Sequence, residues 1–219
     1  MNTAKIWWST PDIDKTVAQI ARVSNPSNQM NQEYKKLLEY MMKEGHVSPF
    51  EMANVCMEIN TTRDIARQIL RHRSFSFQEF SQRYQTVEAL GQLDTTREPR
   101  LQDKKNRQNS TPLDYANDKD RILGAQWEYR LKSFAEEAQK HYEWAISQGI
   151  AKEQARALLP EGLTPSRMYM NGTLRSWIFY LKQRLDPSTQ KEHRQIAQCA
   201  LEQLRYAAPI TMQAFFPEE

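Results

Sequence analysis

The sequence predicts an α+β fold. Three observations support this prediction: short strand-like segments near residues 4–9 and 53–60, helical spacing of apolar residues over most of the remaining chain, and no internal repeat or low-complexity tract. The 219 residues suffice for one substantial core, so we expect a single domain over residues 1–219.

Composition limits the classes of protein to consider. Hydrophobic residues make up 39% of the chain and charged residues 26%, which is typical of a folded globular protein. The net charge of +3 comes from 30 basic and 27 acidic residues, so any strongly positive surface must be local. This balance argues against a general nucleic-acid-binding surface.

The two cysteines, Cys56 and Cys199, are far apart and form no CxxC pair. Neither a disulfide framework nor a zinc ribbon is therefore expected, which indicates a reduced, cytoplasmic setting. The N-terminal residues lack an apolar signal core, and no run approaches the roughly 18 apolar residues of a membrane span. We expect neither export nor membrane attachment.

The first third should contain two strands, each followed by helical segments. Residues 4–9 are strand-like, Pro11 and Asp12 begin a helix, and a second helix over residues 31–44 ends at Gly45. Residues 53–60 alternate apolar and polar side chains as in a half-buried strand, which places Cys56 on the side away from the apolar stripe.

Residues 61–73 follow as a helix capped by a threonine, on which Gln68 and Arg71 are neighbours. After Arg73 the pattern becomes that of an extended chain. An extended backbone sends alternate residues to one side, here the set Phe75, Phe77, Glu79, Ser81 and Arg83.

The polar residues 93–112 are expected to form a long surface excursion, and a long helix should span about 118–148 and end at Gly149. A helical segment then ends at Pro160, and Gly172 is expected to form a tight turn.

The C-terminal part should be helical. One helix carries a buried leucine and isoleucine stripe and ends near Arg184. The last begins at Asp186 and Pro187, with Thr189 and Glu192 as a capping box.

The stretch RHRSFSFQEFSQRYQ, residues 71–85, concentrates anion-binding groups. Basic residues at a helix C-terminus have a plain explanation, because they complement the helix dipole. A second interpretation follows from positions 79, 81 and 83, which carry a carboxylate, a hydroxyl and a guanidinium. Together these groups can bind sugar hydroxyls and a phosphate. Nucleotide binding is therefore the favoured interpretation.

The same stretch resembles the flavin-dependent thymidylate synthases through their RHR-x7-S-x-R signature. This chain has the signature residue at each fixed position, namely Arg71, His72, Arg73, Ser81 and Arg83. Further similar segments occur in the family's order: ARVS (21–24), HVSPFE (46–51), ARQILRHR (66–73), QARALLP (154–160) and NGTLRSWIFYLKQRLD (171–186). The resemblance covers most of the chain and is weakest at 90–125.

The resemblance implies an α+β homotetramer with helices packed on a small, mostly antiparallel sheet and active sites shared between subunits. It implies methylation of dUMP to dTMP, with methylenetetrahydrofolate as carbon donor, FAD as hydride carrier and NADPH as reductant. The cysteines agree with a route that lacks a cysteine nucleophile. Cys56 has no basic neighbour in its strand and Cys199 lies in an alanine-rich helix, so neither is an activated thiol.

The resemblance also implies site residues. The dUMP contacts carried over are Gln68, Arg71, Glu79, Ser81, Gln82, Arg83, Arg156 and Arg184. The FAD contacts are Ser48, Arg71, His72, Arg73, Ser74, Glu79, Thr173, Leu174, Arg175 and Phe179, with His46 near the flavin. Arg184 would be the catalytic residue, because hydride addition at C6 of uracil pushes negative charge toward a ring carbonyl and N3, where a fixed guanidinium stabilises it.

Several residues depart from the family pattern or carry no catalytic assignment. Gln78 replaces the usual Asn, Gln82 the usual Gly and Ser188 the usual His, and a glutamine at 82 needs more room than glycine. Ser81 has no evident base and is assigned to substrate binding. No metal site is expected, because the four histidines lack ligand spacing.

Two alternatives remain at this point. A single-stranded nucleic-acid-binding module could use Arg63, Arg67, Arg71 and Arg73 with stacking phenylalanines, although the balanced charge and Glu79 argue against it. A flavin reductase without methyl transfer would oxidise NADPH equally with and without dUMP.

Overall fold

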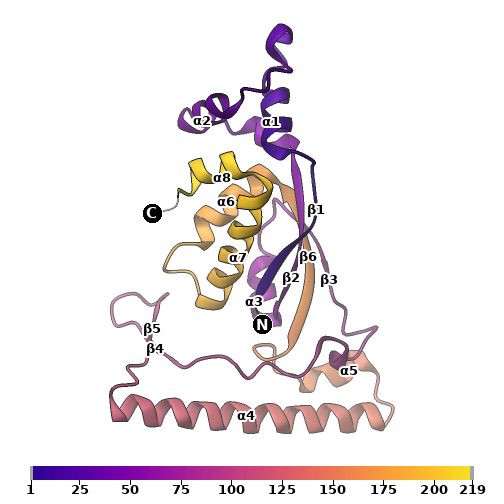
Figure 1. The fold of residues 1–219 in the computed structure, drawn as a ribbon. Coiled ribbons are helices and arrows are strands. Elements are labelled where there is room, and N and C mark those ends of the chain that lie inside the picture. Colours follow the sequence, from indigo (N-terminus) through magenta and orange to yellow (C-terminus); the bar gives the residue numbers. More distant parts are fainter. Residues whose placement is uncertain (1, 218–219) are drawn as a thin grey trace.

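The computed structural model describes residues 2–217 and contains a four-stranded antiparallel sheet with strand order β1-β2-β6-β3. Helices α6, α7 and α8 lie on one face of this sheet (Figure 1). The α+β prediction with a small antiparallel sheet is thereby confirmed. The strands of the sheet are β1 (Thr3–Ser9), β2 (Asn54–Thr62), β3 (Ser76–Glu79) and β6 (Pro165–Thr173).

Helices make up most of the remaining chain. The α-helices are α1 (Ile13–Ala21), α2 (Lys35–Lys43), α3 (Arg63–Ile69), α4 (Asp118–Ser147), α5 (Lys152–Ala155), α6 (Leu174–Arg184), α7 (Lys191–Ala207) and α8 (Pro209–Phe215). Short 3-10 helices are η1 (Pro26–Asn28), η2 (Ser48–Met52), η3 (Val87–Leu90) and η4 (Arg156–Leu158). No helix within residues 2–217 is both long and apolar enough to cross a membrane.

The central strand pair explains where the core lies. Val55, Met57 and Ile59 of β2 are fully buried opposite Gly172, Met170 and Met168 of β6, because alternate residues of paired strands share a face. Helices α6 and α7 cover this face, and the Trp177 indole donates to the carbonyl of Val55 at 3.0 Å. Cys56 lies on the opposite face, as predicted, paired in register with Asn171.

The expected turn at Gly172 is wrong, because this glycine lies inside strand β6. Its function is to admit the ring of Phe75. A Cβ atom at position 172 would lie 2.4 Å from Cδ1 of that ring, closer than two carbon atoms can approach. The chain therefore needs glycine here for space and not for a turn.

The predicted threonine at the N-cap of α3 is confirmed in position, whereas the predicted capping box of α7 is wrong. Thr62 is the N-cap residue of α3, but its side chain makes no capping hydrogen bond and donates instead to Asp64. Helix α7 begins at Lys191 after the N-cap residue Gln190, so Thr189 and Glu192 form no capping box. The Thr189 hydroxyl donates to the carbonyl of Gln183.

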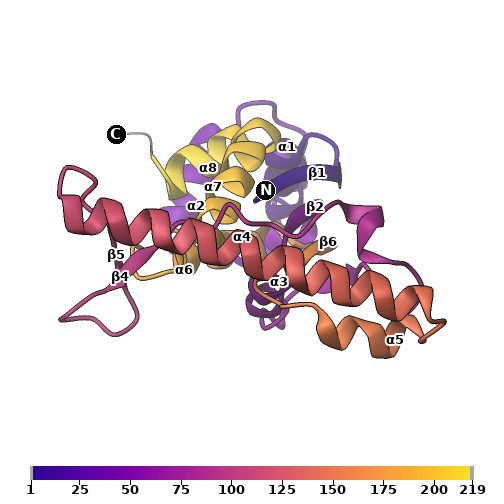
Figure 2. The ribbon, with the colours of Figure 1, turned by 90° about the horizontal axis from the view of Figure 1, so that it is seen from below.

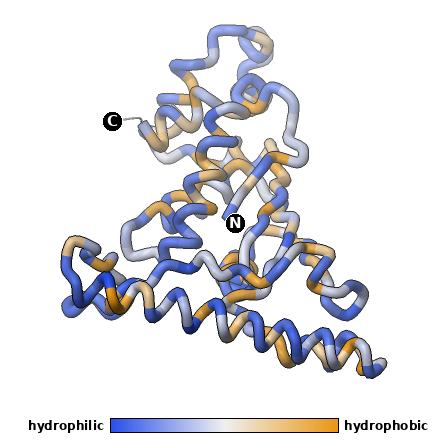
Figure 3. Tube along the Cα trace, turned by 60° about the horizontal axis from the view of Figure 1, so that its bottom comes forward, coloured by the Kyte–Doolittle hydropathy of each residue, from blue (hydrophilic) through white to orange (hydrophobic). Residues whose placement is uncertain are grey.

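Helix α4 lies across one end of the molecule, below the sheet (Figures 1 and 2). It spans Asp118–Ser147, close to the predicted bounds, and its inner face forms a second small core with Val87, Leu93 and Leu163. Hydrophobic positions recur along its whole length (Figure 3). Several of its large apolar side chains are exposed, namely Ile122, Leu123, Trp127, Tyr129, Phe134 and Trp144.

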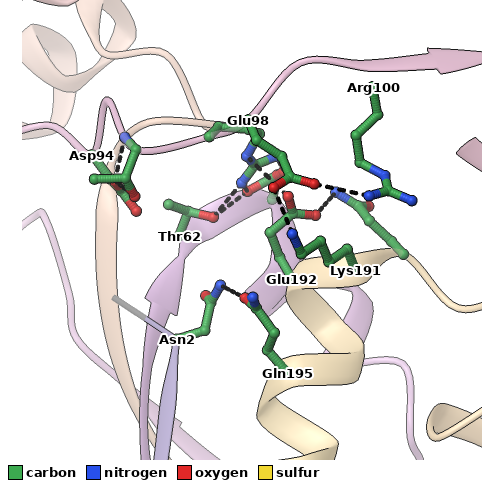
Figure 4. A network of polar contacts seen from close by, with 12 residues as sticks. Asn2, Thr62, Asp94, Glu98, Arg100, Lys191, Glu192 and Gln195 are labelled. Carbon is green, nitrogen blue, oxygen red and sulfur yellow. Dashed lines mark hydrogen bonds and ion pairs between the residues drawn. The ribbon is translucent and has the colours of Figure 1, made fainter. Parts of the chain in front are cut away.

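The polar segment 93–112 contains a hairpin and is joined to the main body by charged contacts (Figure 4). The hairpin consists of β4 (Arg100–Gln102) and β5 (Ser110–Pro112). The Arg97 guanidinium donates to both carboxylate oxygens of Asp64 and to the Thr62 hydroxyl. Lys191 at the start of α7 pairs with Glu98 at 2.5 Å, so the segment is fixed across the ends of α3 and α7.

Candidate active site

The three basic residues of the signature lie in the connection between α3 and β3. Arg71 and Arg73 are exposed, and their guanidinium groups have no hydrogen-bond or ion-pair partner within residues 2–217. Both lie just past the C-terminal end of α3, as the dipole explanation requires. Because no carboxylate neutralises them, they remain available to an anionic ligand.

His72 joins this connection to the end of α6. The Arg184 Nε donates to His72 Nε2 at 2.9 Å, so the proton of the neutral imidazole is on Nδ1. Burial, Arg184 and Arg71 together lower the pKa of His72 to about 4. Burial is also the main cause that lowers the pKa of the Arg184 guanidinium, which nevertheless stays charged. At neutral pH the pair therefore carries one positive charge, on Arg184.

The pair rests on buried aromatic and polar side chains. His72 contacts Tyr180 edge to face with a centroid distance of 4.9 Å, and His193 of α7 lies 6.3 Å away. Gln68, a predicted dUMP contact, is hydrogen-bonded to His193 and to Gln190. The structure thus brings Gln68, His72 and Arg184 together. Sequence reasoning missed His193 and Tyr180, because each reads as an ordinary position on a core helix.

A second group of predicted residues surrounds a pocket of about 440 Å³ beside α3 and η4. Gln82 and Arg156 line it, together with Arg63, Arg67 and two glutamates. Arg83 pairs through its Nε with Glu153 at 3.0 Å. Glu79 accepts from the Ser166 hydroxyl at 2.7 Å and lies 3.6 Å from Arg63. Strand β3 ends at Glu79, so the predicted alternation is wrong for Ser81 and Arg83, which lie in a turn.

The predicted flavin residues gather around the N-terminal end of α6. The Thr173 hydroxyl accepts from the amide of Ser176, whose own hydroxyl donates to the carbonyl of Ser74 at 3.2 Å. Arg175 pairs with Glu51 of η2, the 3-10 helix that begins at Ser48, and its guanidinium lies 5.5 Å from the Phe179 ring centre. The side chain of Leu174 is fully buried in the core, so only its backbone can face a ligand here.

The predicted dUMP residues thus fall into two groups within one chain. Gln68, Arg71 and Arg184 lie near the ends of α3 and α6, whereas Glu79, Gln82, Arg83 and Arg156 lie around the pocket. No hydrogen bond or ion pair within residues 2–217 joins the two groups. Glu79 is also remote from Thr173, because its partner Ser166 lies seven residue steps from Thr173 along β6, about 23 Å at roughly 3.3 Å per residue.

The cysteines offer no activated thiol. Burial raises the pKa of the Cys56 thiol, which is the opposite of what a nucleophile needs. Cys199 is half-buried in α7, and its thiol lies 4.0 Å from the carbonyl oxygen of Asn2. Any chemistry at the sites described above therefore depends on other groups.

Fold and site define an α+β protein whose arginine-rich surfaces suit an anionic ligand such as a nucleotide. A family model described as "Thymidylate synthase complementing protein" matches residues 5–210. The chain is 48% identical over 184 residues to a flavin-dependent thymidylate synthase of Synechocystis, covering 84% of this chain and 80% of the relative. It is 42% identical over 190 residues to a probable flavin-dependent thymidylate synthase of Paramecium bursaria Chlorella virus 1, covering 86% and 84%. The chain belongs to the flavin-dependent thymidylate synthase family.

A solved structure has the same fold. It is the UMP/dUMP methylase PolB from Streptomyces cacaoi bound with 5-Br dUMP, with a TM-score of 0.80 and 26% identity. The match covers 98% of this chain and 94% of that chain. The similarity therefore extends over the sheet, the helices and the segment that resembles the family least.

Proposed function

We propose that this chain, as a flavin-dependent thymidylate synthase, methylates dUMP to dTMP. Methylenetetrahydrofolate would supply the carbon, and NADPH would reduce the FAD that carries the hydride. Family membership supports the reaction, and the relation to a methylase solved with a bromo-dUMP supports the substrate. The observation that carries the proposal is the Arg184 guanidinium, fixed by neutral His72 beside the unpaired Arg71.

Arg184 is the proposed catalytic residue. Its Nε is occupied by His72, so its terminal NH2 groups remain for a ring carbonyl of the uracil. When a hydride adds to C6, negative charge moves toward that carbonyl and N3, and a fixed guanidinium stabilises it. Because His72 is neutral, it does not draw the developing negative charge away from Arg184, and it does not repel Arg184 as a second cation would.

The other dUMP residues have complementary roles. Gln68 and Arg71 lie beside Arg184 and would contact the ring. Glu79, Ser81, Gln82, Arg83 and Arg156 would bind the sugar and phosphate, and the pocket beside α3 has the cationic lining that a phosphate needs.

The residues at the N-terminal end of α6 fit FAD. A flavin dinucleotide carries a negatively charged diphosphate, and Arg71 and Arg73 are unpaired cations near this end within the described chain. The Nε of Arg175 is buried without a partner, and the Phe179 ring is exposed and suited to an aromatic ligand. Ser48, Ser74 and Thr173 would complete the cradle. When bound, FAD supplies the hydride.

We further propose a homotetramer of single-domain subunits with shared sites. Two observations support sharing: no hydrogen bond or ion pair among the described residues joins the two groups of dUMP residues, and α4 exposes large aromatic side chains such as Trp144. A complementation experiment tests it. Arg184→Ala and Arg83→Ala proteins should each be inactive, and mixing them with subunit exchange should restore part of the activity. A mixture that stays as inactive as its components would contradict shared sites.

The reaction is tested by incubating FAD-loaded protein with NADPH, methylenetetrahydrofolate and dUMP and detecting dTMP by mass. Arg184→Ala should retain FAD yet form no dTMP. NADPH oxidation that is equal with and without dUMP, and without dTMP, would favour the flavin reductase. Flavin-free protein that binds oligonucleotides in a salt-dependent manner would favour nucleic-acid binding.

A further inference from the structure

His193 is a buried polar residue that neither the signature nor the proposed reaction accounts for. It lies on α7, and its side chain is 0% exposed. Its Nδ1 is 3.3 Å from Oε1 of Gln68, and its Nε2 is 3.2 Å from the hydroxyl of Tyr180. A buried imidazole with a partner at each nitrogen has a fixed orientation, so its role depends on what it orients.

His193 belongs to a series of hydrogen-bonded side chains that ends at the carboxylate of Glu192, and this carboxylate fixes the direction of each hydrogen bond in the series. Glu192 can only accept when it is ionised, so Gln190 turns its amide nitrogen toward it, at 2.9 Å. The amide oxygen of Gln190 must then accept from Gln68 Nε2, at 2.7 Å. Consequently Oε1 of Gln68 faces His193, whose Nδ1 donates to it.

The remaining groups complete this assignment. With its proton on Nδ1, His193 accepts at Nε2, and the Tyr180 hydroxyl is the donor. Burial, Arg184 and His72 lower the pKa of His193 to about 3, which agrees with a neutral ring. Each group in the series has one consistent orientation, and the Gln68 amide keeps one N–H that no hydrogen bond within residues 2–217 uses.

We infer that His193, anchored by Tyr180, is a positioning residue that holds the Gln68 amide with its unused N–H directed to a carbonyl oxygen of the substrate pyrimidine. This inference rests on the proposed function. His193 itself would touch no reacting atom.

Three substitutions separate positioning from a general structural role. His193→Leu removes both hydrogen bonds at similar volume. His193→Asn places an amide nitrogen near the position of Nδ1 and can still donate to Gln68, whereas His193→Gln places its amide near the position of Nε2. His141→Leu is the matched control, because His141 is an exposed histidine that pairs with Glu137 on α4.

We expect His193→Leu and His193→Gln to lower kcat/KM for dUMP on the order of tenfold, mainly through KM, because the Gln68 amide loses its donor. His193→Asn should keep the KM for dUMP near the parent value. NADPH oxidation without dUMP and FAD content should change little in any variant, as in the control. Two results would overturn the inference. The first is a His193→Leu protein with the kcat/KM of the parent. The second is a loss of FAD and of dUMP-independent NADPH oxidation that His193→Asn does not restore.

Nitrogen NMR of histidine-labelled parent protein tests the assignment without a substitution. The expected signal at pH 7 is a neutral His193 protonated at Nδ1, and a ring protonated at Nε2 or at both nitrogens would overturn the inference. A parent protein that forms no dTMP would refute the proposed reaction instead. The tautomer and the affinity for dUMP alone, measured by calorimetry, would then still decide the role of His193.

Discussion

Replacing Gly172 with alanine tests the packing between β6 and the signature segment. The new methyl group would lie 2.4 Å from Cδ1 and 2.6 Å from Cε1 of Phe75. This ring cannot easily retreat, because it is buried against Trp177 and Tyr180, with centroid distances of 4.9 and 6.1 Å. The clash must therefore move either the strand or the aromatic cluster beneath His72.

Two opposing effects determine how much Gly172→Ala changes the free energy of unfolding. Alanine in place of glycine usually adds about 0.4–1 kcal/mol of stability by restricting the unfolded chain. Overpacking a filled core costs about 1–3 kcal/mol. We expect the clash to dominate, because the ring is enclosed, and the net loss to be roughly 1–2 kcal/mol. For a chain of this size this corresponds to a fall in Tm of about 2–8 °C.

Thermal unfolding at equal protein concentration measures the effect. Gly162→Ala is the matched control, because the nearest atom to its added Cβ would be the Asp64 carboxylate at 4.0 Å, and its Tm should not fall. Phe75→Leu in the Gly172→Ala background should recover part of the loss relative to the sum of the single changes. A Gly172→Ala protein as stable as the parent would refute the packing argument.

Three further predictions concern stability. Arg97→Met should lower the free energy of unfolding, measured in urea, by about 1–3 kcal/mol, because it leaves the half-buried Asp64 carboxylate without its ion-pair partner. Arg67→Met is the control: it breaks an exposed pair with Glu161 and should cost less than about 1 kcal/mol. Asp14→Ala should cost about 0.5–2 kcal/mol in the same assay, because the buried Asp14 carboxylate accepts from the Ile210 and Thr211 amides at the start of α8. In the folded protein the pKa values of His72 and His193 are about 4 and about 3, below the usual 6.5, so the unfolded chain binds more protons at acidic pH. The stability that these two residues contribute should therefore be full above pH 6.5 and fall as the pH drops toward 4 and 3. A pH series of Tm on His72→Asn should show a weaker fall than the parent, and an unchanged fall would exclude His72 as a source.

Local patterns in the sequence determined many of the elements. The alternation in β2 and the apolar stripe of α6 correctly predicted these elements, because strand and helix periods depend only on neighbours in the chain, and the end of α4 was predicted from Gly149. The signature and its flanking segments gave the family, which the family model and the relatives confirm. The individual site residues remain predictions.

Strand β6 was not predicted from its own residues. Its segment PSRMYMNGT lacks a run of β-branched residues and contains a glycine, so local preference does not indicate a strand. Its conformation is fixed by hydrogen bonds to β2 and β3, which come from distant parts of the chain. The side-chain caps at Thr62 and Thr189 are absent for a different reason, because nearby groups, the Asp64 carboxylate and the Gln183 carbonyl, accept from those hydroxyls.

The sequence by itself determined which chemical groups this protein has and in which order they occur. Only the tertiary structure decided that Arg184 meets His72 across 112 residues and that His193 orients Gln68 across 125. Contacts of this kind depend on how α3, α6 and α7 pack on the sheet. Periodicity along the chain carries no information about such packing, because it describes one element at a time.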